Sequence, residues 1–222
     1  MKLRREFLQA VALFRHEWLR EWRQGQWLAG SLLYLTSGIF VTQLLLRPAG
    51  PVTWLTLFWI LILFTVVYVL SRSFLGMSRG LVMYYKTSSP GLLFWLVKVG
   101  HGTLVMGLVM GYCACLMGLW LGFPIRNYGM FGATLALAAP WLSLLLTLVS
   151  AMAQGSAQPA QVMPVLGFPL LVPGLLLLHR MSGLAVDDLE WTVFWPYFWA
   201  MLCLNAALLA LGLLLFPYVW KD

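Results

Sequence analysis

The feature that most constrains how this chain can fold is a series of long apolar runs, separated by short polar intervals. A helix needs roughly 20 residues to cross a bilayer core about 30 Å thick, and the runs approach or exceed that length. Of the 222 residues, 62% are hydrophobic and 9% are charged, whereas soluble domains carry roughly 25% charged residues. The sequence therefore predicts one all-α integral membrane domain that takes up nearly the whole chain.

The apolar runs predict six transmembrane helices, and a helix of a different kind precedes them. Segment 2–24 carries Phe14 and Trp18 on an apolar stripe, with arginines on its other faces. This pattern is typical of an interfacial amphipathic helix, and a solvated lead-in helix is the alternative. The expected spans are 27–46, 52–70, 92–120, 128–153, 162–178 and 194–220, and 71–90 is expected to be a polar cytosolic segment.

The basic residues predict how the spans are oriented. Six Lys and Arg precede the first span, three lie in the interval 71–90, and Lys221 follows the last span. The intervals on the opposite side hold Arg47, Arg126 and Arg180. Basic residues concentrate on the cytosolic side of membrane proteins, so both termini are expected in the cytosol. This distribution explains the net charge of +7 without a nucleic-acid partner.

The fifth span is expected to be kinked. It carries Pro164, Pro169 and Pro173, and each interior proline removes one backbone hydrogen bond from a helix. Neighbouring helices or water can satisfy the freed carbonyls in a membrane, so this helix is a candidate hinge. A loop is predicted from His179 to Trp191, where three of the seven acidic residues gather.

Few residues within the spans can carry chemistry. Lys98 and His101 lie one helical turn apart near the start of the third span. A lysine at this depth usually extends its ammonium group back to the interface, and a role in a transport pathway is the alternative. His101 is expected to be a hydrogen-bonded packing residue. An intramembrane enzyme is disfavoured for want of polar groups at depth, and the three cysteines, all in apolar runs, predict no disulfide or metal site.

Aromatic residues cluster at the start of the sixth span. Trp191, Trp195 and Trp199 are spaced four apart, so they share one helical face. Tryptophans at this depth usually form the aromatic belt of a membrane protein, which is the interpretation we favour. A platform for a flat ligand such as a porphyrin is the alternative, with His179 as its axial ligand.

The interval 71–90 offers a polar surface to the cytosol. The residues in it that we expect to dock on another protein are Arg79, Gly80, Met83, Tyr84, Tyr85 and Lys86. Arginine and tyrosine often anchor protein interfaces, whereas an ordinary basic loop with its tyrosines at the lipid headgroups is the alternative. The only lysine followed by Ser or Thr is Lys86, which has Tyr85 where a phosphate-binding loop needs glycine. Any ATP must therefore be bound by a partner.

Four stretches carry a resemblance to a known family. They are Glu21-Trp22-Arg23-Gln24, the run RGLVMYYKTSSP that ends at Pro90, the run PVLGFPLLVPGLLLL from Pro164, and Phe216-Pro217-Tyr218-Val219-Trp220. In order and spacing, over nearly the whole chain, they resemble heme exporter protein B, the permease of cytochrome c maturation, and most of all its members from Bacteroidetes-type bacteria. The resemblance implies an ABC-2-like permease subunit of the bacterial inner membrane.

The resemblance also implies partners. Two copies of the permease would pair with a cytosolic ATP-binding subunit through the segment from Arg79 to Lys86. They would work beside a heme-handling membrane protein, a small single-span subunit and a heme chaperone. ATP hydrolysis on the partner would release the heme-loaded chaperone, and heme would be a transported or handled ligand, with no cofactor bound firmly by this chain. A non-transporting scaffold of the same complex is the alternative.

Overall fold

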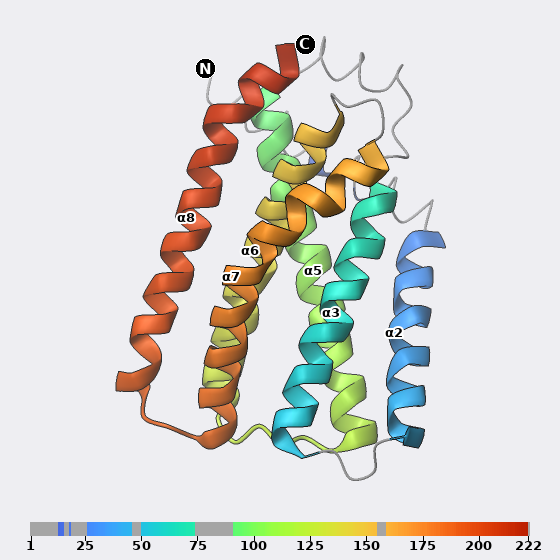
Figure 1. Cartoon of the computed structure of the whole chain (residues 1–222), viewed down its shortest axis with the longest axis vertical. Helices are drawn as coiled ribbons and strands as arrows, with labels where there is room; N and C mark the ends of the chain where they lie inside the picture. The colour runs from blue at the N-terminus through green and yellow to red at the C-terminus, as the bar shows by residue number, and fades with distance from the viewer. Residues whose placement is uncertain are drawn as a thin grey trace.

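The computed structural model describes residues 13–15, 18, 26–45, 50–73, 91–154 and 159–221. The helices are α2 (Gln26–Leu45), α3 (Pro51–Ser73), α5 (Gly91–Leu121), α6 (Tyr128–Gln154), α7 (Pro159–Asp187) and α8 (Trp191–Lys221). They run alternately up and down one bundle, so their ends gather at two opposite ends (Figure 1). We call the end that holds Ser73 and Gly91 the terminal end, because α8 also finishes there. The opposite end, where α7 is followed by α8, is the loop end.

The composition of the helices accounts for a membrane domain. Four segments are long and apolar enough to cross a membrane, namely Gly91–Leu121, Tyr128–Ala153, Val165–Asp187 and Trp191–Phe216. The described apolar stretches of α2 and α3 are shorter, Ala29–Leu45 and Pro51–Val66. The part of the chain that the structure describes is thus an all-α membrane protein, with four helices of spanning length.

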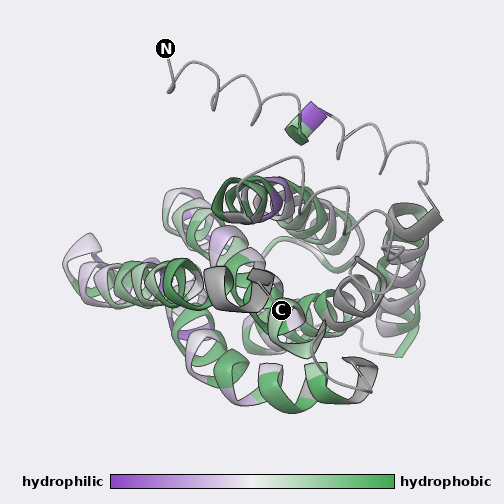
Figure 2. Cartoon of the chain, turned by 90° about the horizontal axis from the view of Figure 1, so that it is seen from above, coloured by the Kyte–Doolittle hydropathy of each residue, from purple (hydrophilic) through white to green (hydrophobic). Residues whose placement is uncertain are grey.

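The central helix of the bundle is α6, which packs against α5, α7 and α8. All its residues from Trp141 to Ala151 are buried. Seen from above, α2 and α8 lie on opposite sides of the bundle (Figure 2). Apolar side chains of α8 such as Leu202 and Leu214 are exposed, as expected of a surface that lies against lipid acyl chains.

Large and small side chains fit together where the helices cross. Trp141 of α6 lies against Gly174 of α7, and Trp95 of α5 lies against Gly212 of α8. A Cβ atom at either glycine would collide with the indole ring of its tryptophan. Small residues let membrane helices approach closely, so these glycines permit the bulky tryptophans to be buried.

The end of α7 corrects the sequence-based prediction. A loop was expected over 179–191, but the helix continues to Asp187, and residues 188–190 alone connect it to α8. The prediction was wrong because His179 and Arg180, at the start of the expected loop, interrupt the apolar run in the sequence but lie off the buried stripe of the helix, which continues beyond them. Met181 and Ala185 on that stripe are fully buried, which stabilises two further turns of helix.

Prolines lie within both α6 and α7. Figure 1 shows α7 bent, with its upper turns oblique to the rest of the helix; it contains Pro164, Pro169 and Pro173. Pro140 lies inside α6 and was not singled out in the sequence. The Nδ2 atom of Asn205 on α8 donates to the carbonyl of Leu137, 3.3 Å away, about one turn before Pro140. A neighbouring side chain thus supports the backbone where the proline weakens the helix.

Hydrogen bonds tie the two connections of the loop end together. Gly122 follows α5 with a φ of +82°, the left-handed conformation that glycine adopts readily after a helix. Asn127 caps α6, because its Oδ1 accepts a hydrogen bond of 3.1 Å from the backbone N–H of Met130. Its Nδ2 donates to Oδ1 of Asp188 at 3.2 Å, and its backbone N–H donates to the carbonyl of Ala185 at 2.9 Å.

Candidate functional site

The residues expected to dock on another protein lie outside the described residues; they are Arg79, Gly80, Met83, Tyr84, Tyr85 and Lys86. The structure describes the helices that flank them. The preceding helix, α3, reaches Ser73, and the following helix, α5, begins at Gly91. Both of these helix ends lie at the terminal end of the bundle (Figure 1), so the interval 74–90 leaves and re-enters the bundle at one end.

His101 of α5 lies beneath N-terminal aromatic residues. Its side chain is 5% exposed. Its ring centroid lies 5.9 Å from that of Phe14 and 5.8 Å from that of Trp18, at interplanar angles of 62° and 72°. Edge-to-face contacts of this kind are favourable because the edge of one ring meets the face of the other. The aromatic residues of the predicted amphipathic segment therefore contact the bundle through His101.

Lys98 lies one turn earlier on α5. It is 9% exposed, and its Nζ atom lies 5.8 Å from the centroid of the Phe94 ring. Because Phe94 is nearer the start of the helix, the ammonium group points toward the terminal end. An ammonium group over an aromatic face is stabilised by a cation–π interaction. Lys98 and His101 thus both contact aromatic side chains.

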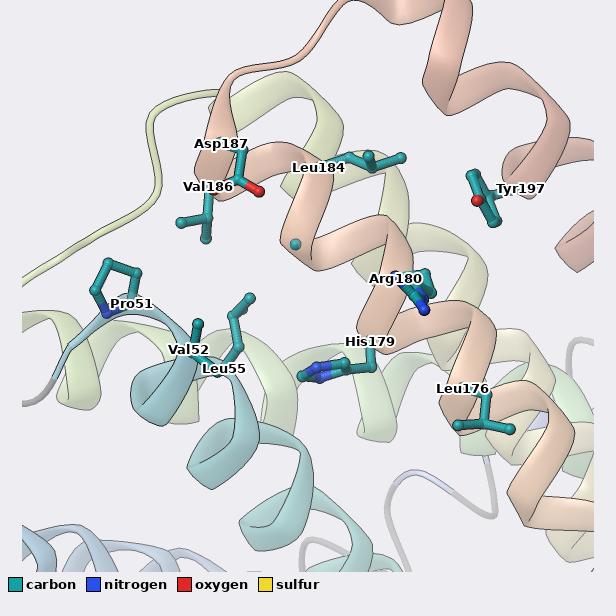
Figure 3. A pocket seen from close by; sticks show the side chains of 11 residues that line it. Pro51, Val52, Leu55, Leu176, His179, Arg180, Leu184, Val186, Asp187 and Tyr197 are labelled. Atoms are coloured by element: carbon teal, nitrogen blue, oxygen red, sulfur yellow. The ribbon is translucent and has the colours of Figure 1, made fainter.

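A cavity of about 680 Å³ opens at the loop end between α3 and α7 (Figure 3). Val52 and Leu55 of α3 and Leu176 and Leu184 of α7 give it apolar walls. Its volume falls within the roughly 300–1,000 Å³ typical of small-molecule pockets, and apolar walls with a few polar groups are typical of them as well. This cavity is the candidate binding site of the described structure.

Four polar side chains line the cavity: His179, Arg180 and Asp187 of α7, and Tyr197 of α8. In Figure 3 the imidazole of His179 extends from α7 toward α3. None of the four side chains forms a hydrogen bond or an ion pair with a residue that the structure describes. Their hydrogen-bonding capacity is therefore available to water or to a ligand.

The tryptophans of α8 form a separate surface. Trp191, Trp195 and Trp199 are 43%, 45% and 56% exposed, whereas Phe194 between them is fully buried. The rings of Trp195 and Trp199 stack at a centroid distance of 6.5 Å and an angle of 29°. We call these three side chains the tryptophan face; the ring of Trp191 also lies against Gly129 of α6.

The structure separates His179 from the tryptophan face. His179 lines the cavity together with Arg180 and Tyr197, and no tryptophan is among the lining residues. Sequence reasoning did not single out Arg180, Asp187 or Tyr197 as site residues. The spacing from Leu176 through His179 and Gly183 to Asp187 is the signal that was available, because these positions share a helical face once α7 is extended.

Metal-binding side chains do not gather in the described part of the chain. No group of three or more His, Cys, Asp or Glu residues there is placed to hold a metal ion. The three cysteines are free: Cys113 is buried in α5, and Cys115 and Cys203 are exposed. The cavity at the loop end has one imidazole, that of His179, among its lining residues.

These features define a multi-pass all-α membrane protein with a cavity at one end. The chain belongs to the CcmB family, because the family model described as CcmB protein matches residues 10–220. This is the heme exporter protein B family, and the chain is a non-catalytic permease subunit for cytochrome c maturation that works with an ATP-binding subunit and other maturation components. Neither a curated protein nor a solved structure matches the chain.

Proposed function

We propose that this chain is the six-span permease of a complex in the bacterial inner membrane, in which ATP hydrolysis releases a heme-loaded chaperone. The family match over residues 10–220 is the observation that carries the proposal. Two permease copies pair with the cytosolic ATP-binding subunit. A heme-handling membrane protein, a small single-span subunit and the heme chaperone complete the assembly. ATP binds to the partner alone, and heme is the ligand that the complex handles.

The lengths and order of the helices support six spans. With 20 and 23 residues, α2 and α3 are each about 30 Å long or longer at roughly 1.5 Å per residue, enough to cross a bilayer core. The start of α2, the end of α3, the start of α5 and the end of α8 lie at the terminal end (Figure 1). The sequence next to these helix ends holds six Lys and Arg before α2, two between α3 and α5, and Lys221. The sequence toward the loop end holds fewer basic residues: Arg47 between α2 and α3, Arg126 before α6 and Arg180 near the end of α7. This asymmetry supports a cytosolic terminal end.

Coupling to ATP hydrolysis rests on the interval 74–90. Closure of the ATP-binding subunit against the segment from Arg79 to Lys86 would move the ends of α3 and α5 that this interval joins. Phe14 and Trp18 contact α5 at His101, so the same movement would reach the N-terminal segment. The bent helix α7 supplies a hinge between α6 and α3, against both of which it packs.

Permease-dependent ATPase activity tests the proposal. The chain is co-expressed with its ATP-binding subunit, and ATPase activity and co-purification are measured for the wild type and for the double variant Tyr84→Ala, Tyr85→Ala. Loss of one true interface anchor costs about 2 kcal/mol, roughly a thirtyfold loss of affinity. Tyr128→Ala is the matched control, because Tyr128 is an exposed tyrosine at the loop end.

We expect association with the ATP-binding subunit, ATPase activity and the yield of holocytochrome c to fall together in the double variant and to stay normal in the control. Full association and normal yield in the double variant would exclude this interval as the coupling surface. ATPase activity that does not depend on the permease, with normal cytochrome yield, would favour the non-transporting scaffold.

A further inference from the structure

We infer that the cavity between α3 and α7 is a binding site for an amphiphilic anion, a molecule with an apolar body and a carboxylate or phosphate group. The inference rests on the shape and lining of the cavity and not on the assignment of coupling residues. The cavity lies at the loop end, opposite the interval 74–90, so ligand binding and ATP coupling occupy different ends of the bundle.

The two helix walls suit the apolar body of such a ligand. Val52 and Leu55 of α3 and Leu176 and Leu184 of α7 line the cavity. In Figure 3, Leu176 and Leu184 lie on the side of α7 toward Tyr197. Val52 is 72% exposed and Leu176 is 63% exposed, so these side chains can pack against the apolar body of a ligand in place of lipid acyl chains. Such contacts hold the apolar body without fixing the orientation of its acidic group.

The polar lining suits the acidic group of the ligand. The guanidinium of Arg180 offers five N–H donors in a planar fork that matches a carboxylate or phosphate. His179 and Tyr197 line the same cavity and add a ring N–H and a phenolic O–H. Asp187 lies seven residues beyond Arg180, about 10 Å along the helix axis, so it leaves the cationic group unneutralised.

Two sources provide this chemistry: the phosphate of an anionic lipid headgroup and the carboxylates of a tetrapyrrole. The two ligands would interact differently with His179. An imidazole can coordinate the iron of a haem, whereas a lipid has no metal for it to coordinate. A tetrapyrrole as the occupant rests on the proposed function, whereas the anion site does not.

The cavity can be filled without disturbing the backbone. Gly183 of α7 lines it, and a Cβ atom built at Gly183 meets no atom within 4 Å. Gly183→Leu therefore places an isobutyl group where the ligand would lie. Gly132→Leu is the matched control, because Gly132 of α6 also has nothing within 4 Å of its Cβ position and does not line the cavity.

Ligand binding is measured on the purified full-length chain in nanodiscs of phosphatidylcholine, without any partner subunit. Hemin and metal-free protoporphyrin IX are titrated by absorbance and fluorescence, and a short-chain phosphatidylglycerol is tested directly and as a competitor. Arg180→Ala is compared with Arg126→Ala, because Arg126 is an exposed arginine at the loop end outside the cavity. Loss of a charge-assisted hydrogen bond weakens binding about ten- to hundredfold.

We expect Arg180→Ala and Gly183→Leu to weaken binding by that factor, and Arg126→Ala and Gly132→Leu to bind as the wild type does. His179→Ala should weaken hemin binding and spare protoporphyrin if iron is coordinated. Binding of phosphatidylglycerol without either tetrapyrrole would identify the ligand as a lipid. Far-UV circular dichroism and elution volume verify that each variant is folded.

The site assignment is overturned if Arg180→Ala binds every probe as tightly as Arg126→Ala, or if no probe binds the wild type. Because the assay contains no ATP-binding subunit, its failure leaves the proposed coupling function standing. Conversely, failure of the ATPase experiment leaves the anion site standing.

Discussion

A histidine side chain lies at each end of the bundle, and its surroundings differ between the two ends. At the terminal end, the imidazole of His101 is 5% exposed and packs edge to face against Phe14 and Trp18. At the loop end, the imidazole of His179 lines an open cavity beside Gly183, a residue with no side chain. The size of the neighbouring residues explains this difference in packing. Large aromatic rings fill the space around the imidazole of His101, whereas glycine leaves space beside the imidazole of His179. The terminal end is therefore suited to transmitting movement, and the loop end to binding a ligand.

This comparison requires that the two ends face opposite sides of the membrane. Cysteine labelling tests that requirement directly and has the largest expected effect. Single cysteines at Gly50 and Glu190, both exposed at the loop end, are introduced into a chain whose native cysteines are replaced. We expect both to react fully with an impermeant thiol reagent added outside intact cells. Cysteines at Ser78 and Ser156, in the intervals between helices that meet at the terminal end, should react only after the cells are opened.

Permeabilised cells are the control for that labelling, because all four positions should then react. Reaction of Ser78→Cys and Ser156→Cys in intact cells, with protection of the other two, would invert the orientation. Reaction of one position from each pair would contradict the six-span proposal itself, since it would require a helix of the bundle to stop short of crossing.

The second prediction concerns the two histidines. His101→Ala removes two ring contacts worth about 0.5–1.5 kcal/mol each and leaves a cavity, so the free energy of unfolding should fall by about 2–3 kcal/mol. His179→Ala removes a side chain that already faces open space, and its cost should stay within about 0.5 kcal/mol. Thermal unfolding in detergent, monitored by circular dichroism, measures both effects.

Phe14→Leu provides the control for the histidine pair, because it removes one of the two rings and should cost less than His101→Ala. Equal destabilisation by His101→Ala and His179→Ala would mean that the two ends do not differ in packing. The division between a mechanical end and a binding end would then fail.

Much of the fold follows from local sequence, because a span is specified by the composition of its own residues. The end of α7 does not, since polar His179 and Arg180 interrupt the apolar run in the sequence, while the buried stripe beside them continues to Ala185. Whether the helix ends at such a pair depends on what the next turns can be buried against. That information resides in α3 and α6, which pack on α7 and are distant in sequence.

The candidate site was less predictable than the fold for the same reason. The cavity is lined by residues of α3, α7 and α8, and the spacing of three helices is not encoded in the residues of any one of them. His179 was selected from the sequence for its chemistry, but its partners Arg180 and Tyr197 were not. The contact between Phe14 and His101 was equally hidden, because it joins residues far apart in the chain.

The smallest effect is expected for a substitution in the tryptophan face. This face lies at the loop end, as the cavity does, so the substitution compares two surfaces of the same end. Trp195 is 45% exposed and does not line the cavity, so Trp195→Ala should change the free energy of unfolding by about 0.5 kcal/mol or less. It should leave hemin and phosphatidylglycerol binding unchanged. Trp95→Ala is the matched control, because Trp95 is 1% exposed and truncation of a buried tryptophan costs about 3–5 kcal/mol.

A belt residue and a ligand platform differ in what Trp195→Ala does to binding. A belt tryptophan rests in the lipid interface, where its loss changes anchoring slightly and leaves the cavity as it was. A platform would hold the flat ligand against Trp195 and Trp199, and its loss would weaken hemin binding as strongly as Arg180→Ala. Equal loss in these two variants would move the ligand from the cavity to the outer face of α8. Unchanged binding in Trp195→Ala, with weakened binding in Arg180→Ala, would place the ligand between α3 and α7.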